Sequence, residues 1–172
     1  MVVACSEVFH SGISCSRRTG YGSGMAITGN YVPSTAGWVR DQVELFEKTG
    51  GKEGNSLLET GIGVVIVTML GGKTGNVRKI ALMRVEHEGE YALVASMGGR
   101  PTNPVWYYNL LADPTTVTVQ DGPEPFDVTV REVTGNEKAV WWERSVALFP
   151  PYAEYQAKTE RQIPVLIATR VR

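Results

Sequence analysis

The chain has 172 residues, of which 42% are hydrophobic, and this is enough for one domain with its own apolar core. Its 17 lysines and arginines are balanced by 18 aspartates and glutamates, so no overall basic field favours nucleic acid as a partner. No apolar run is long enough to span a bilayer, and both cysteines, Cys5 and Cys15, fall in the first stretch of the chain. A disulfide scaffold is therefore excluded, and a reducing, cytoplasmic compartment is expected.

Residues 1–30 differ in composition from the rest of the chain. They are rich in Ser, Gly and Thr and show neither helical nor strand periodicity. The pair Arg17-Arg18 resembles the start of a twin-arginine signal, but polar residues follow where such a signal needs an apolar segment. We therefore predict a disordered N-terminal extension over residues 1–30 and a single folded domain over residues 31–172.

Hydrophobic patterning predicts the strands and helices of the folded domain. Strands are expected at residues 62–70, 77–85, 91–97, 115–120, 126–133 and 163–171. Helices are expected from a cap at Ser34 or Thr35 to Gly50, then at residues 104–112, 137–149 and 152–159. Because short turns join most neighbouring strands, antiparallel hairpins dominate. The pattern fits an α+β fold, mainly β, in which a small antiparallel barrel carries helices at its rim.

The first two strands are joined by a turn that is rich in glycine and positive charge. Lys73 lies at its tip, and Arg78 and Lys79 open the next strand. The string Gly72-Lys73-Thr74 resembles the end of a Walker A loop, but Val67 replaces the first glycine of that motif and a strand follows instead of a helix. The three cations and several free backbone N–H groups nevertheless give this turn the chemistry of an anion site. On the evidence of this turn alone, solvated hairpin charges are the favoured interpretation, because a Gly/Lys turn is a weak signal.

Two aromatic stretches are the other candidates for a site. They are Trp106-Tyr107-Tyr108-Asn109 and Phe149-x-x-Tyr152-x-x-Tyr155, and the spacing of the second places its rings on one helix face. Core packing is the usual explanation of such a face. Two features weaken this explanation. Tyr152 follows a Pro-Pro break, where irregular chain is expected near the surface at the barrel mouth, and a tyrosine hydroxyl needs a polar partner. The isolated His10 and His87 predict neither a metal site nor a catalytic base.

Several short motifs follow one another from the glycine-rich turn to the end of the chain. They are Gly72-Lys73-Thr74-Gly75-x-x-Arg78, Ala95-Ser96-x-Gly98-Gly99, Asn103-Pro104-x-Trp106-Tyr107-x-Asn109-Leu110-x-Ala112-x-Pro114, Tyr152-x-x-Tyr155-Gln156 and Thr159-x-Arg161-x-Ile163-Pro164-Val165. This ordered combination resembles the deazaflavin-dependent nitroreductase family, whose members are oxidoreductases of actinobacterial type that use coenzyme F420. The resemblance extends from about Pro33 to the C-terminus, and it is the order of the motifs that makes it specific.

The resemblance implies an architecture and a cofactor site. The fold would be a six-stranded antiparallel split β-barrel, similar to the FMN-binding split barrels. Lys73, Thr74 and Arg78 would hold the phosphate and glutamate tail of F420, while backbone and aromatic groups would enclose its flat ring. The cofactor-binding residues that it implies are Gly72, Lys73, Thr74, Arg78, Lys79, Ile80, Val94, Ala95, Ser96, Met97, Val105, Trp106, Tyr107, Tyr108 and Asn109.

The resemblance also implies a reaction. A hydride would pass from reduced F420 (F420H2) to an electrophilic acceptor such as a quinone, an unsaturated lactone or a nitroaromatic compound. Ser96 or Tyr152 would donate or relay the proton, and Phe149, Tyr152 and Tyr155 would contact the substrate. Members that reduce nitroimidazoles often have tyrosine in place of Phe149 and lysine in place of Met97. These two departures weaken the expectation of nitro reduction but not that of F420 use.

Two alternatives remain at the level of the sequence. One is an oxidoreductase that binds FMN in the same barrel, and the other is a non-catalytic protein that carries or stores F420. The expected partner is a small-molecule electron acceptor, with no nucleic acid and no metal. The sequence leaves open a peripheral membrane contact through a quinone substrate, and it leaves open a homodimer.

Overall fold

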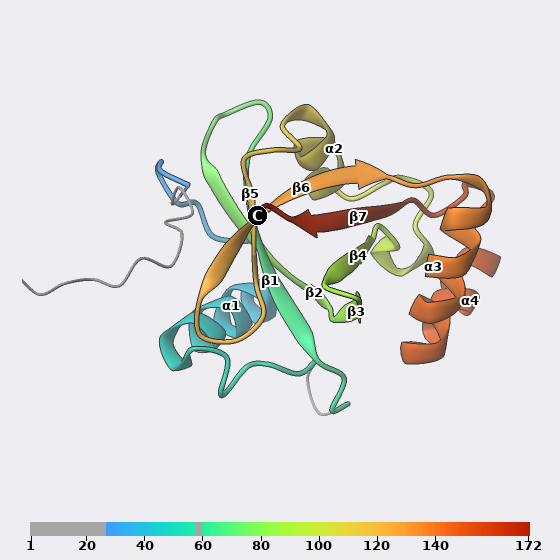
Figure 1. Ribbon diagram of the computed structural model, residues 1–172, viewed down its shortest axis with the longest axis horizontal. Helices are drawn as coiled ribbons and strands as arrows, with labels where there is room; N and C mark the ends of the chain where they lie inside the picture. Colours follow the sequence, from blue (N-terminus) through green and yellow to red (C-terminus); the bar gives the residue numbers. More distant parts are fainter. Residues whose placement is uncertain (1–26, 58–59) are drawn as a thin grey trace, which may run out of the picture.

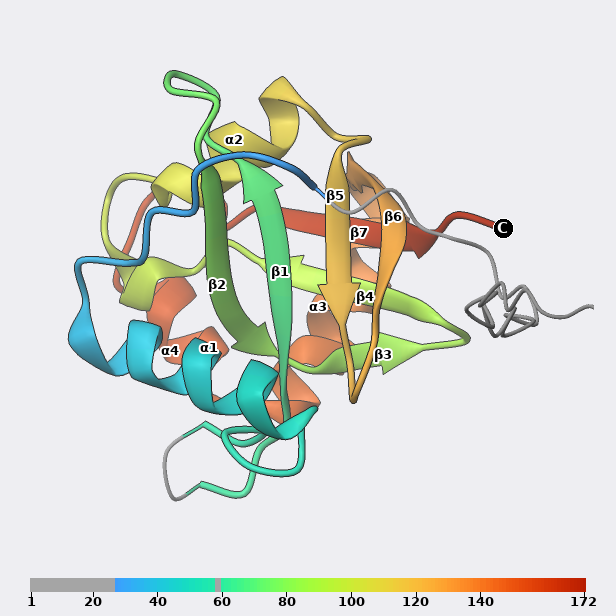
Figure 2. The ribbon, with the colours of Figure 1, turned by 90° about the vertical axis from the view of Figure 1, so that its left-hand side faces the viewer.

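The structure, a computed structural model, describes residues 27–57 and 60–172 (Figure 1). Most of the predicted extension, residues 1–26, therefore lies outside the described residues. One antiparallel sheet curls into a half-barrel, with the strand order β2-β1-β5-β6-β7-β4-β3 (Figure 2). The strands are β1 Val64–Leu70, β2 Val77–Met83, β3 Val85–His87, β4 Glu90–Val94, β5 Val117–Gln120, β6 Pro125–Glu132 and β7 Val165–Arg170. The predicted fold class, a mainly-β α+β fold with an antiparallel split barrel and helices at its rim, is confirmed.

In the described part of the chain, four α-helices and one 3-10 turn surround the sheet. They are α1 Gly37–Thr49, η1 Met97–Gly99, α2 Val105–Ala112, α3 Gly135–Leu148 and α4 Pro151–Ala157. Helix α1 begins after the predicted caps: Ala36 is its N-cap, and the Ser34 hydroxyl only accepts a hydrogen bond from the Ala36 N–H at 3.2 Å. None of the helices in the described ranges is long and apolar enough to cross a membrane.

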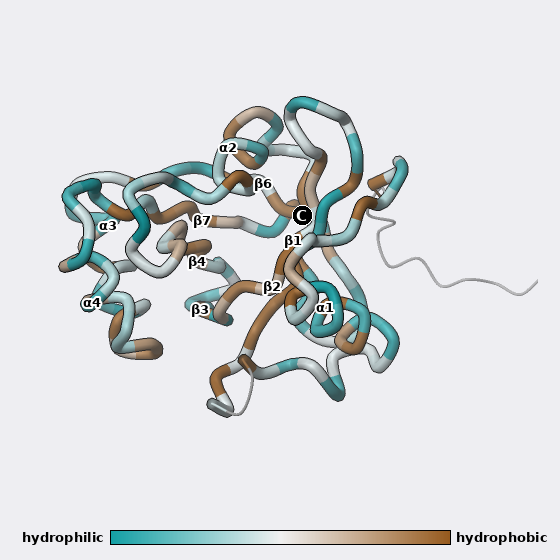
Figure 3. The backbone as a smooth tube through the Cα atoms, turned by 180° about the vertical axis from the view of Figure 1, so that it is seen from behind, coloured by the Kyte–Doolittle hydropathy of each residue, from teal (hydrophilic) through white to brown (hydrophobic). Residues whose placement is uncertain are grey.

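Strand β1 is buried on both faces, as its continuous apolar sequence predicts. Val65, Val67 and Met69 point into the main core of the half-barrel, where they pack with side chains of β4, β5, β6 and β7. Val64 and Ile66 point the other way and pack under Val43 and Phe46 of α1. Hydrophobic residues accordingly follow the sheet strands in Figure 3, with the polar stretches in the loops. Because helix and core hold β1 from both sides, the turn that follows it is firmly placed.

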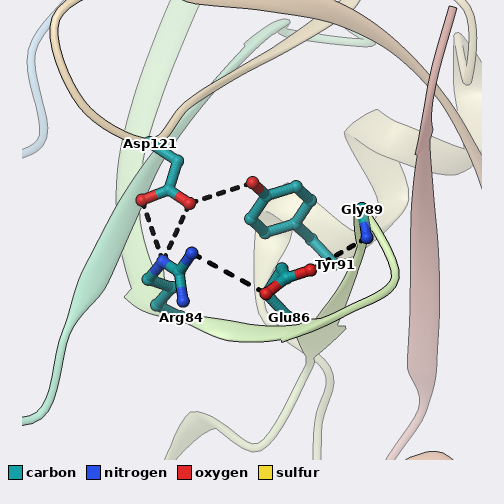
Figure 4. A network of polar contacts seen from close by, with 5 residues as sticks. All are labelled: Arg84, Glu86, Gly89, Tyr91 and Asp121. Atoms are coloured by element: carbon teal, nitrogen blue, oxygen red, sulfur yellow. Dashed lines mark hydrogen bonds and ion pairs between the residues drawn. The ribbon is translucent and has the colours of Figure 1, made fainter.

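The sheet has one strand more than the six expected, because the predicted strand at residues 77–85 is interrupted at Arg84. Here the chain changes partner: β2 pairs with β1, whereas β3 pairs with β4. A polar network holds the break (Figure 4). The Arg84 Nε lies 2.9 and 2.8 Å from the two carboxylate oxygens of Asp121, which also accepts a 2.9 Å hydrogen bond from the Tyr91 hydroxyl. Arg84 also lies 3.7 Å from Glu86 of β3. Because Asp121 contacts both Arg84 and Tyr91, the break is connected to the β5–β6 turn and to β4.

The Tyr91 phenol predicts a loss of stability at alkaline pH. Burial, and next the hydrogen bond to Asp121, raise the pKa of Tyr91 from about 10 to about 12. Since the folded pKa is the higher one, the neutral phenol stabilises the fold fully below pH 10, and this contribution is lost as the pH rises toward 12. The free energy of unfolding, measured with urea at several alkaline pH values, should therefore fall more steeply with rising pH for the parent chain than for Tyr91→Phe. Parallel declines would show that Tyr91 does not ionise differently in the folded state.

Candidate active site

Two adjoining cavities form one groove across the open side of the sheet. The larger, the basic cavity, has a volume of about 980 Å³ and is lined by Val32, Ser34, Thr35, Gly71, Gly72, Lys73, Thr74, Arg78, Lys79, Ile80, Val105, Trp106, Tyr108, Asn109 and Ala112. The smaller, the aromatic cavity, has a volume of about 560 Å³ and is lined by Ser34, Trp38, Val39, Leu57, Val64, Ile80, Ala81, Leu82, Met83, Val94, Ser96, Met97, Gly98, Pro104, Trp106, Phe149, Tyr152 and Tyr155. Ser34, Ile80 and Trp106 line both, so the two cavities share a wall.

The glycine-rich turn between β1 and β2 forms one end of the basic cavity. Its backbone donors are largely used within the protein, so the prediction of several free N–H groups was wrong. The N–H groups of Thr74 and Gly75 donate to the Gly71 carbonyl, at 3.0 and 2.7 Å, and that of Gly72 donates to the Asn109 side chain at 3.0 Å. Only the Lys73 N–H has no such partner in the described part of the turn. An anion at this end must therefore be held mainly by side chains.

The three cations of the basic cavity are not equivalent. The Lys79 ammonium lies 2.6 Å from the Glu47 carboxylate, and this ion pair between β2 and α1 neutralises it. Arg78 donates only to the Val32 carbonyl, at 3.3 Å, and Lys73 is exposed; neither has a carboxylate partner among the described residues. Lys73 and Arg78 thus carry charges that no described carboxylate neutralises, whereas Lys79 has a structural partner.

The aromatic cavity lies at the gap between the two ends of the curled sheet. β2 contributes Ala81, Leu82 and Met83, while β4 and the segment after it contribute Val94, Ser96 and Met97. Three rings from the end of α3 and from α4 close the cavity: the Tyr152 ring centroid lies 5.0 Å from that of Phe149 and 6.4 Å from that of Tyr155. Apolar walls with a few hydroxyl groups are typical of a pocket for a flat organic molecule.

Tyr152 lies in a helix, as expected for residues 152–159, and the prediction of irregular chain directly after the Pro-Pro pair was wrong. It belongs to the first turn of α4 and is only 5% exposed. Pro151 begins this helix, because the first helical residue needs no N–H donor and the ring presets its φ. Burial, and then the charge of Tyr155, raise the pKa of Tyr152 above its ordinary value, so the phenol stays protonated at neutral pH. No described residue hydrogen-bonds its hydroxyl.

Two residues predicted to bind the cofactor do not line either cavity. Tyr107 packs toward the main core, and its hydroxyl donates a 2.9 Å hydrogen bond to Glu132. Ala95 is fully buried. Conversely, Trp38, Val39 and Leu57 line the aromatic cavity, although no sequence motif marks them as site residues. Val39 and Leu57 reach it because α1 and the segment after it pack against β1 and β2.

The close approach of η1 to α4 yields a prediction about Gly99. A Cβ at this position would lie 2.5 Å from the Tyr155 carbonyl oxygen, and the Gly99 φ of +79° is strained for other residues. Gly99→Ala should therefore displace α4, lower the free energy of unfolding by about 1–3 kcal/mol, and raise the KM for the acceptor. Gly98→Ala is the matched control, because its φ is also positive but nothing lies within 4 Å of its Cβ. Equal effects of the two changes would show that the contact with α4 is unimportant.

Comparisons with known proteins agree with this geometry. A sequence profile of the family described as F420H(2)-dependent quinone reductase matches residues 38–170. The F420H(2)-dependent quinone reductase Rv1261c of Mycobacterium tuberculosis is 32% identical over 129 residues, which cover 73% of this chain and 85% of that protein. A solved F420-H2-dependent reductase, FDR-A, is 52% identical with a TM-score of 0.58, covering 61% of this chain and 92% of that one.

A second solved structure, described as a domain-swapped dimer, is 47% identical with a TM-score of 0.60. The match covers 78% of this chain and 99% of that one. The family profile spans α1 except its first residue, most of the lining of both cavities, and the seven strands of the described sheet. The chain therefore belongs to the F420H(2)-dependent quinone reductase family and is an F420-dependent oxidoreductase.

Proposed function

We propose that the chain transfers a hydride from F420H2 to a quinone held in the aromatic cavity. The observation that carries this proposal is the continuity of the groove, in which a cavity with unpaired cations adjoins a cavity with aromatic walls. Family membership sets aside the two alternatives, an FMN enzyme and a non-catalytic carrier. The assignment of the acceptor and of the residue roles rests on the charges and side chains that line the two cavities.

The residues of the groove fit the two parts of F420. Its anionic tail matches the basic cavity, where Lys73 and Arg78 are free of carboxylates and the Thr74 hydroxyl is at hand. Its flat ring matches the apolar and aromatic walls around Trp106, which belongs to both cavities. Glycine at position 72 lets the turn pack closely on α2, since a Cβ there would lie 3.2 Å from that of Ala112.

When bound, the reduced deazaflavin supplies the hydride, while the protein binds the cofactor and orients and polarises the acceptor. The hydroxyls of Ser96 and Tyr152 line the aromatic cavity, and neither has a hydrogen-bond partner among the described residues. Each can therefore donate to an acceptor oxygen on which negative charge develops. Phe149 and Tyr155 flank Tyr152 and help to exclude water from the cavity.

The composition of the aromatic cavity supports a quinone over the other acceptor classes. Most of its lining is apolar, with Trp38, Leu57 and Met83 among the residues, and no described charged side chain lines it. Such walls suit an uncharged ring with aliphatic substituents. Phe149 lies beside Tyr152 and offers no second hydroxyl to a nitro group. Lactones and nitroaromatic compounds are thus the second choices.

Anaerobic turnover with purified protein tests the proposal. F420H2 is mixed with quinones of differing side-chain length, with an unsaturated lactone and with a nitroaromatic compound, and the appearance of oxidised F420 is followed by its absorbance. Quinones should give the highest kcat/KM, and reduced FMN should not replace F420H2. Turnover of the nitroaromatic compound without turnover of any quinone would overturn the assignment of the acceptor.

Two associations stay predictions. A homodimer is supported by the similar structure described as a domain-swapped dimer, and light scattering of the purified chain would test it. Peripheral membrane contact depends on whether the quinone is lipid-borne, and sedimentation with quinone-loaded vesicles would test that.

A further inference from the structure

Arg161 binds both ends of the segment that carries Ser96 and Met97. Its Nη2 donates to the carbonyls of Ala95 at 3.1 Å and Ser96 at 2.9 Å. Its Nε donates to the Arg100 carbonyl at 2.8 Å, and its Nη1 donates to the Asn103 side chain at 2.6 Å. One guanidinium therefore spans the loop from residue 95 to residue 103, which forms part of the wall of the aromatic cavity.

This loop has few other anchors. Met97, Gly98 and Gly99 all have positive φ values, so the chain here is neither strand nor regular helix. Its backbone hydrogen bonds are mostly local, such as Gly99 N–H to the Ser96 carbonyl at 3.0 Å, and the Ala95 N–H bond to the Pro164 carbonyl at 3.0 Å lies at its edge. A loop of this kind keeps its shape only if other parts of the fold hold it.

Arg161 is also connected by hydrogen bonds to helix α4, which carries Tyr152 and Tyr155. The Gln156 side chain of α4 donates to the Arg161 carbonyl at 2.8 Å and accepts from the Ile163 N–H at 2.9 Å. Through Gln156 and Arg161, the α4 wall of the aromatic cavity is connected to the Ser96 wall opposite. Ser96 and Tyr152, which line these two walls, are thus connected through one set of hydrogen bonds.

The charge of Arg161 is not neutralised. All four of its acceptors are neutral oxygens, and it forms no ion pair within residues 27–57 and 60–172. Partial burial lowers the pKa of its guanidinium, but arginine stays protonated at neutral pH. The Arg161 guanidinium therefore keeps a full positive charge beside the aromatic cavity, and this charge favours negative charge inside the cavity.

We propose that Arg161 is a positioning residue for hydride transfer. Its planar fork holds the Ser96 hydroxyl in the cavity wall, and its unpaired charge stabilises the negative charge that develops on the acceptor. This inference rests on the proposed function, since it concerns the same cavity. Positioning errors of about 1 Å can cost two orders of magnitude in rate, so the expected effect lies on kcat.

Three variants test it: Arg161→Gln, Arg161→Lys and the control Arg131→Gln, which breaks an exposed ion pair away from both cavities. Arg161→Gln should lower kcat about 10–100-fold with the quinone KM changed less than about 3-fold. Arg161→Lys keeps the charge without the fork and should recover part of this loss. Arg131→Gln should leave kcat unchanged. Full kcat in Arg161→Gln, or a loss no larger than its loss of folded protein, would overturn the proposal.

Hydrogen exchange of the cofactor-free chain separates this inference from the proposed function. Arg161→Gln should accelerate exchange of the amides in residues 95–103 while β7 stays protected, and F420 affinity should be measured on the same sample. If the unaltered chain reduces no quinone, the assignment of the acceptor fails. The hydrogen-exchange result alone then decides whether Arg161 holds the loop of residues 95–103. Unchanged exchange in residues 95–103 would show that Arg161 does not hold the loop.

Discussion

Tyr152→Phe is expected to lower kcat for quinone reduction by about 10²–10³-fold, the cost of losing one donor to a developing oxyanion. The substitution keeps the ring, which packs against Phe149 and Trp142, and removes only the hydroxyl. The raised pKa of Tyr152 makes the phenol a weak acid but keeps it a hydrogen-bond donor throughout the neutral range. F420 affinity should stay within about twofold of the parent value, because Tyr152 does not line the basic cavity.

The stability of the same variant gives a second readout. The Tyr152 hydroxyl is placed in a buried ring cluster without a partner among the described side chains, and such an arrangement does not stabilise the fold. Tyr152→Phe should therefore not reduce the free energy of unfolding in urea. Loss of turnover without loss of stability is the signature of a group kept for function.

Tyr155→Phe is the matched control for Tyr152→Phe. Tyr155 lines the same cavity, is more exposed and lies under the Lys158 ammonium, 5.4 Å from its ring centroid. Its hydroxyl is one helical turn further along, so kcat should fall less than about 5-fold. If Tyr152→Phe retains full turnover, the hydrogen bond or proton comes from Ser96 or water instead.

Much of the fold could be predicted because its signals are local. The apolar run of β1 predicts a strand buried on both faces, and Val64 to Val67 are all at most 2% exposed. Short turns join β1 to β2 and β5 to β6, which fixes their antiparallel pairing. The extra strand was missed because the break at Arg84 depends on Asp121 and Tyr91, which are distant in sequence.

The candidate site was predicted in composition but not in its internal contacts. Most of the residues implied by the family resemblance do line the groove, with Tyr107 and Ala95 as the exceptions. No local pattern reveals that Glu47 neutralises Lys79 or that Arg161 holds the Ser96 loop, since these partners come from separate elements. The position of Tyr152 was misjudged because a Pro-Pro pair can begin a helix as well as end one.

Arg78→Ala is expected to raise the Kd for F420 about 10–150-fold, or about 1.5–3 kcal/mol, the range for a hydrogen bond to a charged group. Arg78 lines the basic cavity from the start of β2, and its only protein acceptor is the Val32 carbonyl. Lys73→Ala should weaken binding in the same direction but less, because its exposed ammonium is more strongly screened. Fluorescence titration of F420 measures both effects.

Lys79→Ala separates a binding role from a structural one. Lys79 lines the same cavity, but its charge is held by Glu47 and its ammonium lies 4.9 Å from the Tyr31 ring centroid. Its removal should therefore change the Kd less than about 3-fold and act mainly on the packing of α1 against β2. Added salt should weaken F420 binding to the parent chain more than to Arg78→Ala, since the variant has one ionic contact fewer to screen. If all three variants bind F420 as the parent does, the cations of the turn are only solvated hairpin charges, and the tail of the cofactor lies elsewhere.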